Sequence, residues 1–213
     1  MFIAASVLAV SCAGEKAEEA TTGAAQEVKE VATATKVMLE EGSTVTWRGF
    51  KTFVDWSHTG TIGVDGSFSV ESDAVVGGSI NIDWNNITVE AFADGVKEGY
   101  LLGHIRSQDF FFVDSFPTAT FEIVSVEALE GEGVNSNVVG NLTLRGVTNS
   151  IEFPANIAVS EEGVSFSAPT FSIDRTKWGA KYHDREDATI AESLKEDLID
   201  HKIELTFDVM AKG

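Results

Sequence analysis

The sequence has little cysteine, little proline and little basic charge. Its 213 residues include 1 Cys and 3 Pro against 19 Gly. A single cysteine excludes an intrachain disulfide and a thiolate metal cluster. Few prolines and many glycines argue against a proline-rich linker protein and favour tight turns between strands. The length suits one large domain, or one domain with appendages, and not two full cores.

The charge of the chain is strongly one-sided. Lys and Arg total 15 against 34 Asp and Glu, so the net charge is −19. Such a field repels phosphate backbones and anionic headgroups, which excludes sequence-general nucleic-acid binding and a polybasic membrane patch. No apolar run reaches the ~20 residues that a membrane-spanning helix needs. Hydrophobic residues still make up 43% of the chain, which is enough to bury a core.

The lone cysteine, Cys12, closes an apolar N-terminal run. Residues 1–12 read MFIAASVLAVSC, with the small Ser11 directly before Cys12. This pattern predicts a lipoprotein-type signal peptide over residues 1–11 and a lipidated Cys12 as the mature N-terminus. An ordinary secretory signal with an incidental Cys12 is the alternative. The lipoprotein reading predicts a bacterial cell-envelope protein, periplasm-facing or on the surface, held to a membrane by its N-terminal lipid anchor.

The segment after Cys12 is acidic and lacks large apolar side chains. Residues 13–36 are rich in Ala, Glu, Thr and Gly and contain no aromatic residue. Because alanine buries little surface, helix in this segment would be only transient. We therefore expect residues 12–42 to form a disordered acidic tether that the folded domain does not need.

Common signatures of catalysis are also missing. The four histidines, His58, His104, His183 and His201, form no HExxH motif and no close pair. No Gly-x-Ser-x-Gly elbow is present, and the only thiol belongs to the N-terminal signal. We therefore predict no catalytic residue, no metal site, no cofactor and no enzymatic activity.

From residue 43 onward polar and apolar residues alternate. This period of two is typical of strands with one wet and one dry face. The clearest examples are Thr44 to Trp47, Ser79 to Trp84, Asn141 to Leu144 and Lys202 to Val209. Further candidates span residues 57–64, 67–70, 119–126, 150–159 and 164–173, and Gly or Asx turns separate them.

About eight antiparallel strands in one domain predict an up-and-down barrel or a closely related sandwich. Two stretches, residues 88–106 and 188–198, have helical spacing and predict short helices at the ends of the barrel. We thus expect an all-β domain over residues 43–213, with one or two short helices.

A cluster of phenylalanines interrupts the strands. Residues 110–116 contain four Phe, followed by Pro117. Four such side chains are too much apolar surface to leave in water, at roughly 1.5–3 kcal/mol each when buried. They face either a packed core or a ligand, and the residues themselves leave both readings open.

Six short segments, taken in order, resemble the motifs of the YceI-like family. They are Trp47–Gly49 (WRG), His58–Gly60 (HTG), residues 99–111 (GYLLGHIRSQDFF), residues 116–121 (FPTATF), residues 139–148 (VGNLTLRGVT) and residues 171–179 (FSIDRTKWG). The resemblance covers essentially residues 43–213. It implies an extended lipocalin-like antiparallel barrel whose interior holds a long isoprenoid or similar amphiphilic chain, in proteins that are usually exported.

The alternation and the resemblance together nominate ligand-contacting residues. An eight-stranded barrel has room for its own side chains or for one slim ligand, and a linear hydrocarbon is such a ligand. The predicted apolar tunnel and mouth comprise Trp47, Ile80, Ile82, Trp84, Phe110, Phe111, Phe116, Phe121, Leu142, Leu144, Phe171 and Trp178.

Three polar side chains are candidates for a ligand headgroup. His58 and His104 fall on family motifs, where they bind either loops or a headgroup. Arg175 either forms a buried ion pair with Asp174 that braces the last loop, or meets an anionic headgroup with its planar fork.

Two function classes remain. The first is an exported lipid-binding protein that holds an isoprenoid or acyl chain as carrier or reservoir. The second is a non-enzymatic envelope stress or surface interaction module whose barrel is packed and binds no ligand. The oligomeric state stays open, with a homodimer among the alternatives.

Overall fold

The computed structural model describes residues 17–90, 95–186 and 192–212. The predicted signal peptide and Cys12 lie outside these residues. Among the described residues no helix is long and apolar enough to cross a membrane.

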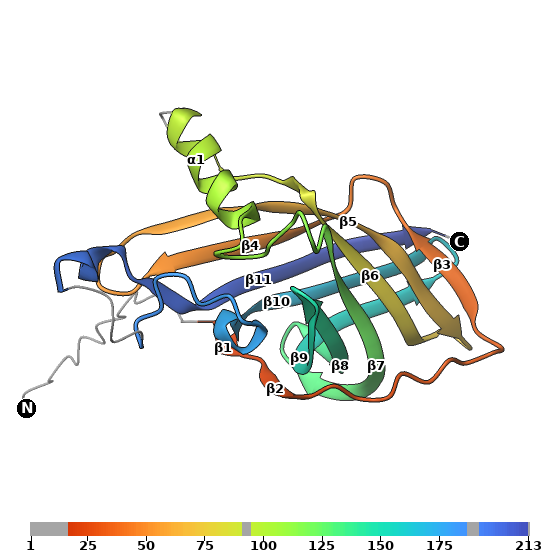
Figure 1. Cartoon of the computed structure of the whole chain (residues 1–213). Coiled ribbons are helices and arrows are strands. Elements are labelled where there is room, and N and C mark those ends of the chain that lie inside the picture. The colour runs from red at the N-terminus through yellow and green to blue at the C-terminus, as the bar shows by residue number, and fades with distance from the viewer. Residues whose placement is uncertain (1–16, 91–94, 187–191, 213) are drawn as a thin grey trace, which may run out of the picture.

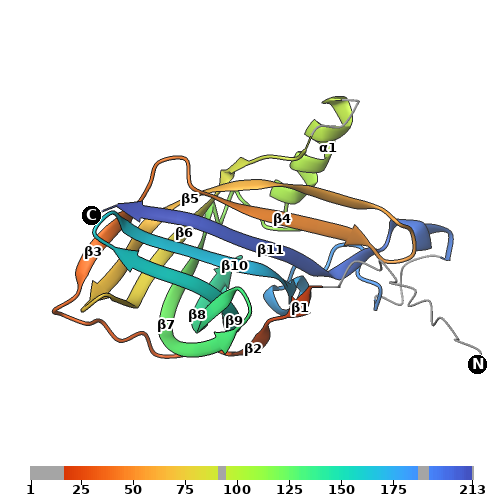
Figure 2. The same ribbon diagram turned by 180° about the vertical axis from the view of Figure 1, so that it is seen from behind.

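Eight strands form a closed antiparallel barrel. Each pairs with the next along the chain, and the last, β11, pairs with the first, β4 (Figure 1). Their bounds are β4 (Thr44–Lys51), β5 (Ser57–Glu71), β6 (Ala74–Ile87), β7 (Thr118–Gly131), β8 (Val134–Leu144), β9 (Val147–Ser160), β10 (Gly163–Asp174) and β11 (Ile199–Lys212). Figure 2 shows the closure from behind, with β11 between β4 and β10. The predicted all-β, eight-stranded antiparallel barrel is confirmed.

The β8–β9 hairpin shows how the sequence produces these strands. Leu142 and Leu144 point into the barrel, while the hydroxyl of Thr143 on the opposite face lies 2.8 Å from that of Thr148. The two-residue turn between the strands is Arg145-Gly146, with φ of 51° and 74°. Two left-handed residues match the twist of a tight hairpin, and glycine adopts this conformation without steric cost.

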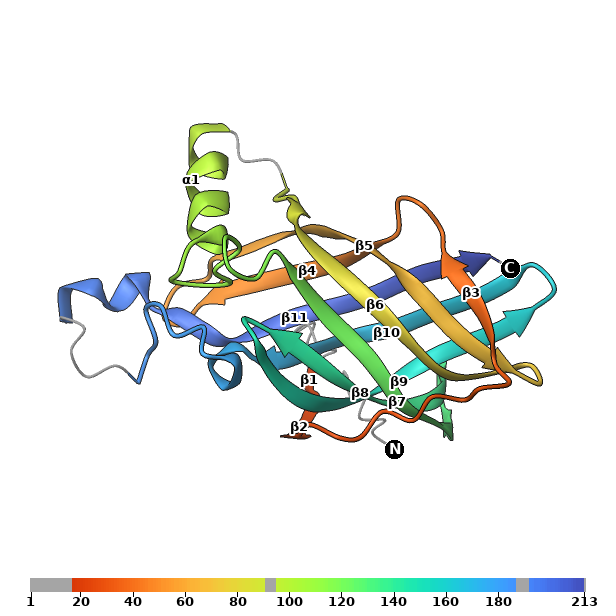
Figure 3. The same ribbon diagram turned by 45° about the vertical axis from the view of Figure 1, so that its right-hand side comes forward.

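The two ends of the barrel differ. One end, here called the mouth end, carries the β4–β5 turn, the helix α1 (Gly95–Arg106) and the 3₁₀ turns η1 (Arg175–Trp178) and η2 (Glu192–Asp197). Figure 3 shows α1 and η2 at this end. The other end, here called the far end, carries the turns between β5 and β6, β7 and β8, and β9 and β10.

The described parts of the two predicted helical segments differ from the prediction. The helix predicted over residues 88–106 begins at Gly95, because Thr88 and Glu90 are extended and donate their backbone N–H groups to Thr61 and Thr59 of β5 at 2.7 and 2.8 Å. In the second predicted helix, residues 192–197 form a 3₁₀ turn, and residues 188–191 lie outside the described chain.

The prediction of a disordered tether over residues 12–42 is wrong for residues 18–24 and 35–39. This segment forms β1 (Glu18–Glu19), β2 (Thr21–Ala24) and β3 (Thr35–Leu39). β3 pairs with β5 and β11 beyond the start of β4, so that β3 and β4 together fill one position of the barrel.

β1 and β2 close a gap in the barrel wall. β9 and β10 pair directly only between residues 156–160 and 163–167. Toward the mouth end their edges are bridged by residues 18–24, here called the N-terminal strap, which runs parallel to β10 and antiparallel to β9. Unpaired backbone groups at these edges would be costly when buried, and the strap satisfies them. The alanine-rich composition of this segment does not predict its pairing with strands that are distant in sequence.

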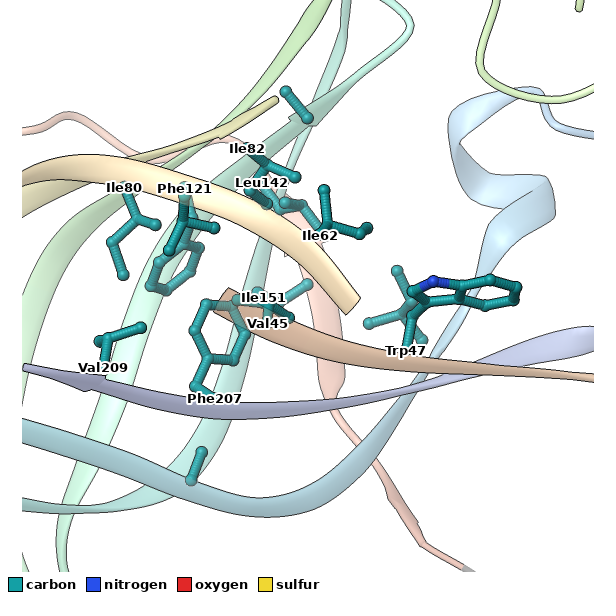
Figure 4. Packing of buried hydrophobic residues seen from close by; sticks show 14 of the residues in the cluster. Val45, Trp47, Ile62, Ile80, Ile82, Phe121, Leu142, Ile151, Phe207 and Val209 are labelled. Atoms are coloured by element: carbon teal, nitrogen blue, oxygen red, sulfur yellow. The ribbon is translucent and has the colours of Figure 1, made fainter. Parts of the chain in front are cut away.

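The far half of the barrel is filled by aromatic packing. Phe153 stacks on Phe171 at 4.3 Å, and Phe68 stacks on Phe166 at 5.5 Å. Phe207 lies about 6 Å from four rings of this group, those of Phe121, Phe153, Phe166 and Phe171. In Figure 4 Phe121 and Phe207 lie together, and Trp47 lies farther along β4. Side chains therefore occupy the interior on one side of Phe207.

Candidate functional site

A cavity of about 190 Å³ lies in the mouth half of the barrel. Its walls are almost entirely apolar and come from seven barrel strands and α1. The lining residues are Val45, Trp47, Gly49, Phe50, Lys51, Trp56, His58, Ile62, Ile82, Trp84, Ile87, Leu101, Ile105, Phe110, Phe111, Leu142, Leu144, Ile151, Ile173, Arg175, Ile199, Lys202, Ile203, Leu205 and Phe207. The cavity exceeds the ~150 Å³ void that admits benzene, and it is smaller than the ~300–1,000 Å³ of drug-sized sites.

Phe207 forms the floor of the cavity. It lines the cavity and also belongs to the phenylalanine packing of the far half. Only 1% of Phe207 is exposed, so its ring separates open space from packed space. The depth available to a ligand therefore depends on this side chain.

The helix α1 and the segment after it cover one side of the cavity. Leu101 and Ile105, four residues apart on α1, both line it. Phe111 stacks on Trp84 of β6 with ring centroids 4.0 Å apart. The backbone N–H of Phe111 donates to the Ile105 carbonyl at 3.1 Å, which fixes the turn after the helix.

One buried donor in this wall lacks a partner. Trp84 is 4% exposed, and its indole N–H makes no hydrogen bond within the described residues. An unsatisfied buried donor costs free energy comparable to a lost hydrogen bond. A polar ligand atom beside Trp84 would satisfy it.

Trp56 and His58 lie at the edge of the cavity, at the start of β5. The Trp56 indole N–H donates to Nε2 of His58 at 2.8 Å, which requires that nitrogen to be unprotonated. Burial lowers the pKa of His58, and the nearby charge of Lys51 lowers it further. His58 is therefore a neutral acceptor at neutral pH.

Arg175 is a fully buried cation that lines the cavity. Nε donates to the Asp200 carbonyl at 2.9 Å and Nη2 to the Ile199 carbonyl at 3.0 Å, and Nη1 donates to the Ala180 carbonyl. Its guanidinium also lies 5.6 Å from the centre of the Phe110 ring. Burial lowers the pKa of Arg175 from its ordinary value.

The ion pair between Asp174 and Arg175, one of the two alternatives that the sequence raised, is not formed. The Asp174 carboxylate instead accepts from the backbone N–H and hydroxyl of Thr176 at 2.9 and 2.6 Å, and so caps η1. Arg175 does brace the last loop, but through carbonyl groups. Carbonyls left exposed by the irregular β10–β11 connection compete effectively for a guanidinium with five donors.

The cavity brings together nine of the residues that the sequence nominated. They are Trp47, Ile82, Trp84, Phe110, Phe111, Leu142, Leu144, His58 and Arg175. Six nominated residues do not line it. Ile80, Phe121 and Phe171 are buried outside the cavity, and Trp178 is buried with its indole N–H donating to the Leu142 carbonyl at 2.9 Å. Phe116 packs on Phe112 and Gly146, and His104 packs between Tyr100 and Tyr182.

Several cavity residues were not nominated. On β11 these are Ile203, Leu205 and Phe207, although the alternation of that strand carries the signal for them. Leu101 and Ile105 had the i, i+4 spacing of a helix face as their only signal. The face that α1 presents to the cavity follows from tertiary packing.

The site and the fold define a class: a lipocalin-like up-and-down barrel that encloses an apolar cavity. The YceI-like domain family matches residues 36–211, and the chain belongs to that family. This assignment includes β3, which the sequence analysis had placed outside the domain.

Curated relatives and solved structures agree with this family. The chain is 33% identical over 94 residues to Protein YceI of Salmonella arizonae, a match covering 44% of each chain. It is 32% identical over 130 residues to a UPF0312 protein of Staphylococcus aureus, covering 56% of this chain and 71% of that one. The matches to the Pseudomonas aeruginosa UPF0312 proteins span 44% of their length.

Two solved structures share the fold. BcnA of Burkholderia cenocepacia superposes with a TM-score of 0.56 at 17% identity, covering 80% of this chain and 96% of that one. A polyisoprenoid binding domain from Saccharophagus degradans superposes with a TM-score of 0.60 at 14% identity, covering 85% and 99%.

Proposed function

We propose that this protein binds one long apolar chain, an isoprenoid or a similar acyl chain, with the chain's end inside the barrel. The observation that carries the proposal is the apolar cavity above Phe207, which is walled by seven strands and α1. The Saccharophagus neighbour is described as a polyisoprenoid binding domain, which favours a prenyl chain as the ligand.

The energetics favour a hydrocarbon in this cavity. Each CH₂ group moved from water into an apolar site gains about 0.8 kcal/mol. A few such groups offset much of the cost of immobilising the chain. With about 190 Å³ available, the cavity holds the leading part of a chain, and the rest of the chain lies toward the mouth end.

The polar end of the ligand lies near the mouth end in this proposal. Arg175 adds positive charge to the wall, and Lys51 and Lys202 line the same cavity. Trp84 offers an unused N–H donor. These groups suit an amphiphile that carries an oxygen-rich or anionic end.

The proposed role is a carrier or reservoir, without catalysis and without a cofactor, in the cell envelope. Lipidated Cys12 would hold it to a membrane. Replacing Cys12 by Ala should release the protein from the membrane fraction, because the anchor is then lost. Unchanged partitioning of the Cys12→Ala variant would show that the anchor assignment is wrong.

Mass spectrometry of organic extracts from the purified protein tests the ligand directly. Prenyl or acyl species should be recovered, and added ligand should raise the thermal unfolding midpoint with concentration. If the extracts contain no such lipid, and no prenyl or acyl ligand protects the protein at any concentration, the binding proposal fails.

The phenylalanine packing of the far half favours a second candidate. There the barrel is filled by its own rings, as a surface interaction module without a ligand would be. The same two measurements separate the candidates, because a packed module yields clean extracts and an unfolding midpoint that does not respond to lipid.

A further inference from the structure

Two segments of the mouth end, the β4–β5 turn and α1, carry exposed aromatic rings. Phe53 is 61% exposed, Trp56 is 52% exposed and Tyr100 is 73% exposed. In the part of the chain that the structure describes, these three are the aromatic members of the exposed large apolar side chains. We call Phe53, Trp56 and Tyr100 the aromatic rim. Large apolar surface at one place on a molecule marks a contact surface.

The aromatic rim is continuous with the cavity. Trp56 lines the cavity and is also half exposed. Phe53 belongs to the same β4–β5 turn, and Tyr100 directly precedes Leu101, a cavity-lining residue of α1. An apolar chain that leaves the cavity beside Trp56 therefore meets the β4–β5 turn, which also carries Phe53.

The turn that presents Phe53 and Trp56 is held in place by hydrogen bonds. Lys51 donates its backbone N–H to the Trp56 carbonyl at 3.0 Å, and Thr52 donates to the Leu198 carbonyl at 2.9 Å. The Lys51 ammonium also lies 3.0 Å from the Asp197 carboxylate. The turn that exposes Phe53 and Trp56 is therefore ordered, and hydrogen bonds and an ion pair connect it to the segment between β10 and β11.

The far end presents a different surface. Its exposed apolar side chains include Met38 at 59% and Met210 at 46%. Acidic residues lie in turns of both ends, Glu132 and Glu162 at the far end and the exposed Asp55 at the mouth end. Methionine and carboxylate lack the amphipathic ring that favours the membrane interface. The two ends therefore form a natural pair for comparison.

We propose that the aromatic rim docks on a lipid bilayer and that the ligand chain passes between bilayer and cavity at this contact. The inference rests on the proposed function, because only an apolar ligand needs such a route. Trp and Tyr rings favour the headgroup level of a bilayer. Each methylene group that crosses open water adds to the cost of transfer, and a mouth pressed on the bilayer avoids that crossing.

The reach of the N-terminus agrees with this orientation. Glu18 pairs with Phe171, three residues before β10 ends at the mouth end. Five residues, 13–17, separate Cys12 from Glu18. The six steps along the chain from Cys12 to Glu18 span at most about 20 Å. A lipidated Cys12 would hold the mouth end close to the membrane, because the N-terminal strap removes the slack that a long tether would give.

The net charge decides which bilayer to use. A net charge of −19 opposes anionic lipids, so vesicles of phosphatidylcholine are the appropriate probe. The test attaches an environment-sensitive fluorophore to a single cysteine in the full chain. Cys12→Ala removes the native thiol, and Phe53→Cys, Tyr100→Cys, Met38→Cys and Met210→Cys each supply one label site.

When vesicles are added, the emission of a fluorophore at position 53 or 100 should shift to shorter wavelength and increase in intensity. It should not change at positions 38 and 210. Residues 1–11 are common to all four proteins, so any attachment through them does not create a difference between the ends. Equal responses at all four sites, or none at any site, would overturn the docking proposal.

A transfer assay separates this proposal from the proposed function. The Phe53→Ser/Tyr100→Ser variant should take up a fluorescent prenyl chain from vesicles more slowly than the wild type, with unchanged affinity for the same chain in detergent solution. Met38→Ser/Met210→Ser is the matched control and should transfer at the wild-type rate. Binding in solution without a rim effect refutes docking alone. Label insertion without any binding refutes the proposed function, and with it the ligand route, but leaves the docking of the aromatic rim.

Discussion

The side-chain amide of Asn141 on β8 makes two hydrogen bonds with the backbone of Gln26. Its Nδ2 donates to the Gln26 carbonyl at 2.7 Å, and its Oδ1 accepts from the Gln26 N–H at 2.9 Å. Asn141 is 4% exposed whereas Gln26 is exposed, so both bonds are partly buried. The chain that leaves the N-terminal strap is therefore joined to the barrel wall by a specific, two-point contact.

Asn141→Ala should lower the free energy of unfolding by about 0.5–1.5 kcal/mol, because both hydrogen bonds to the Gln26 backbone are lost and water can reach the exposed Gln26. Denaturant titration measures this change. A variant with wild-type stability would show that the contact between residues 26 and 141 does not stabilise the folded protein.

The N-terminal strap itself can be tested with neighbouring substitutions. Ala20 is 5% exposed and packs in the core, and its backbone N–H donates to the Ser172 carbonyl at 2.9 Å. Ala20→Asp buries a charge and should destabilise the barrel strongly. Thr21→Asp places the same charge on an exposed side chain and should cost little. Equal stabilities of the two variants would mean that the strap is not part of the folded wall.

Much of the barrel followed from alternation, whereas the strap did not. In β8 and β11 every second residue over Val138 to Leu144 and over Ile203 to Ala211 is apolar or Gly, which indicates strands without knowledge of their partners. The pairings of Glu18 with Phe171 and of Thr22 with Ile151 depend on a gap between two strands more than a hundred residues away. Short strands of this kind are stabilised by tertiary context and not by propensity.

The same limit applies to the cavity. Leu144 and Phe121 both point inward, and alternation treats them alike. Leu144 borders open space and Phe121 is enclosed by rings, because the register of neighbouring strands and the size of the facing side chains differ. The packing of the interior therefore determines which of the inward side chains contact a ligand.

Phe207 should set the length of chain that enters the barrel. Phe207→Ala removes the floor and should shift the bound species toward longer chains, at a cost of about 3–5 kcal/mol in stability. Lipid extracts analysed by mass spectrometry report the chain length. Phe166→Ala is a matched control, because Phe166 belongs to the same packing but does not line the cavity. A similar shift for both variants would argue against a floor at Phe207.

Leu144→Trp should fill the cavity. Because open space lies beside Leu144, the larger ring should block ligand binding while costing less than the ~1–3 kcal/mol that is usual for overpacking. Ile123→Trp, in the packed half, provides the comparison and should be the more destabilising change. Thermal unfolding with and without ligand measures both effects. Equal destabilisation of the two variants would indicate that no usable space exists beside Leu144.

Arg175→Met tests whether the buried guanidinium is needed for the β10–β11 connection. Three backbone carbonyls lose their donor, each at a cost of about 1–3 kcal/mol when buried. We expect a large loss of stability. Arg48→Met, at a side chain that is 51% exposed, should be nearly neutral. If the Arg175→Met variant is as stable as the wild type, Arg175 does not stabilise the connection, and its main role is to contact a ligand headgroup.

His58 should make stability depend on pH near neutrality. Burial and Lys51 lower its pKa below its ordinary value of 6.5, so the unfolded chain binds a proton more readily than the folded protein does. This contribution to stability is present above pH 6.5 and is lost as the pH falls through the lowered folded pKa.

Protonation of His58 Nε2 also removes the acceptor of the Trp56 N–H bond. His58→Gln keeps an acceptor that does not titrate, so the variant should lose less stability than the wild type between about pH 7 and pH 5. Unfolding midpoints measured across this interval, with His183→Gln as the control at another exposed turn, check the assignment. If wild type and His58→Gln lose stability in parallel, the pH dependence originates from other groups.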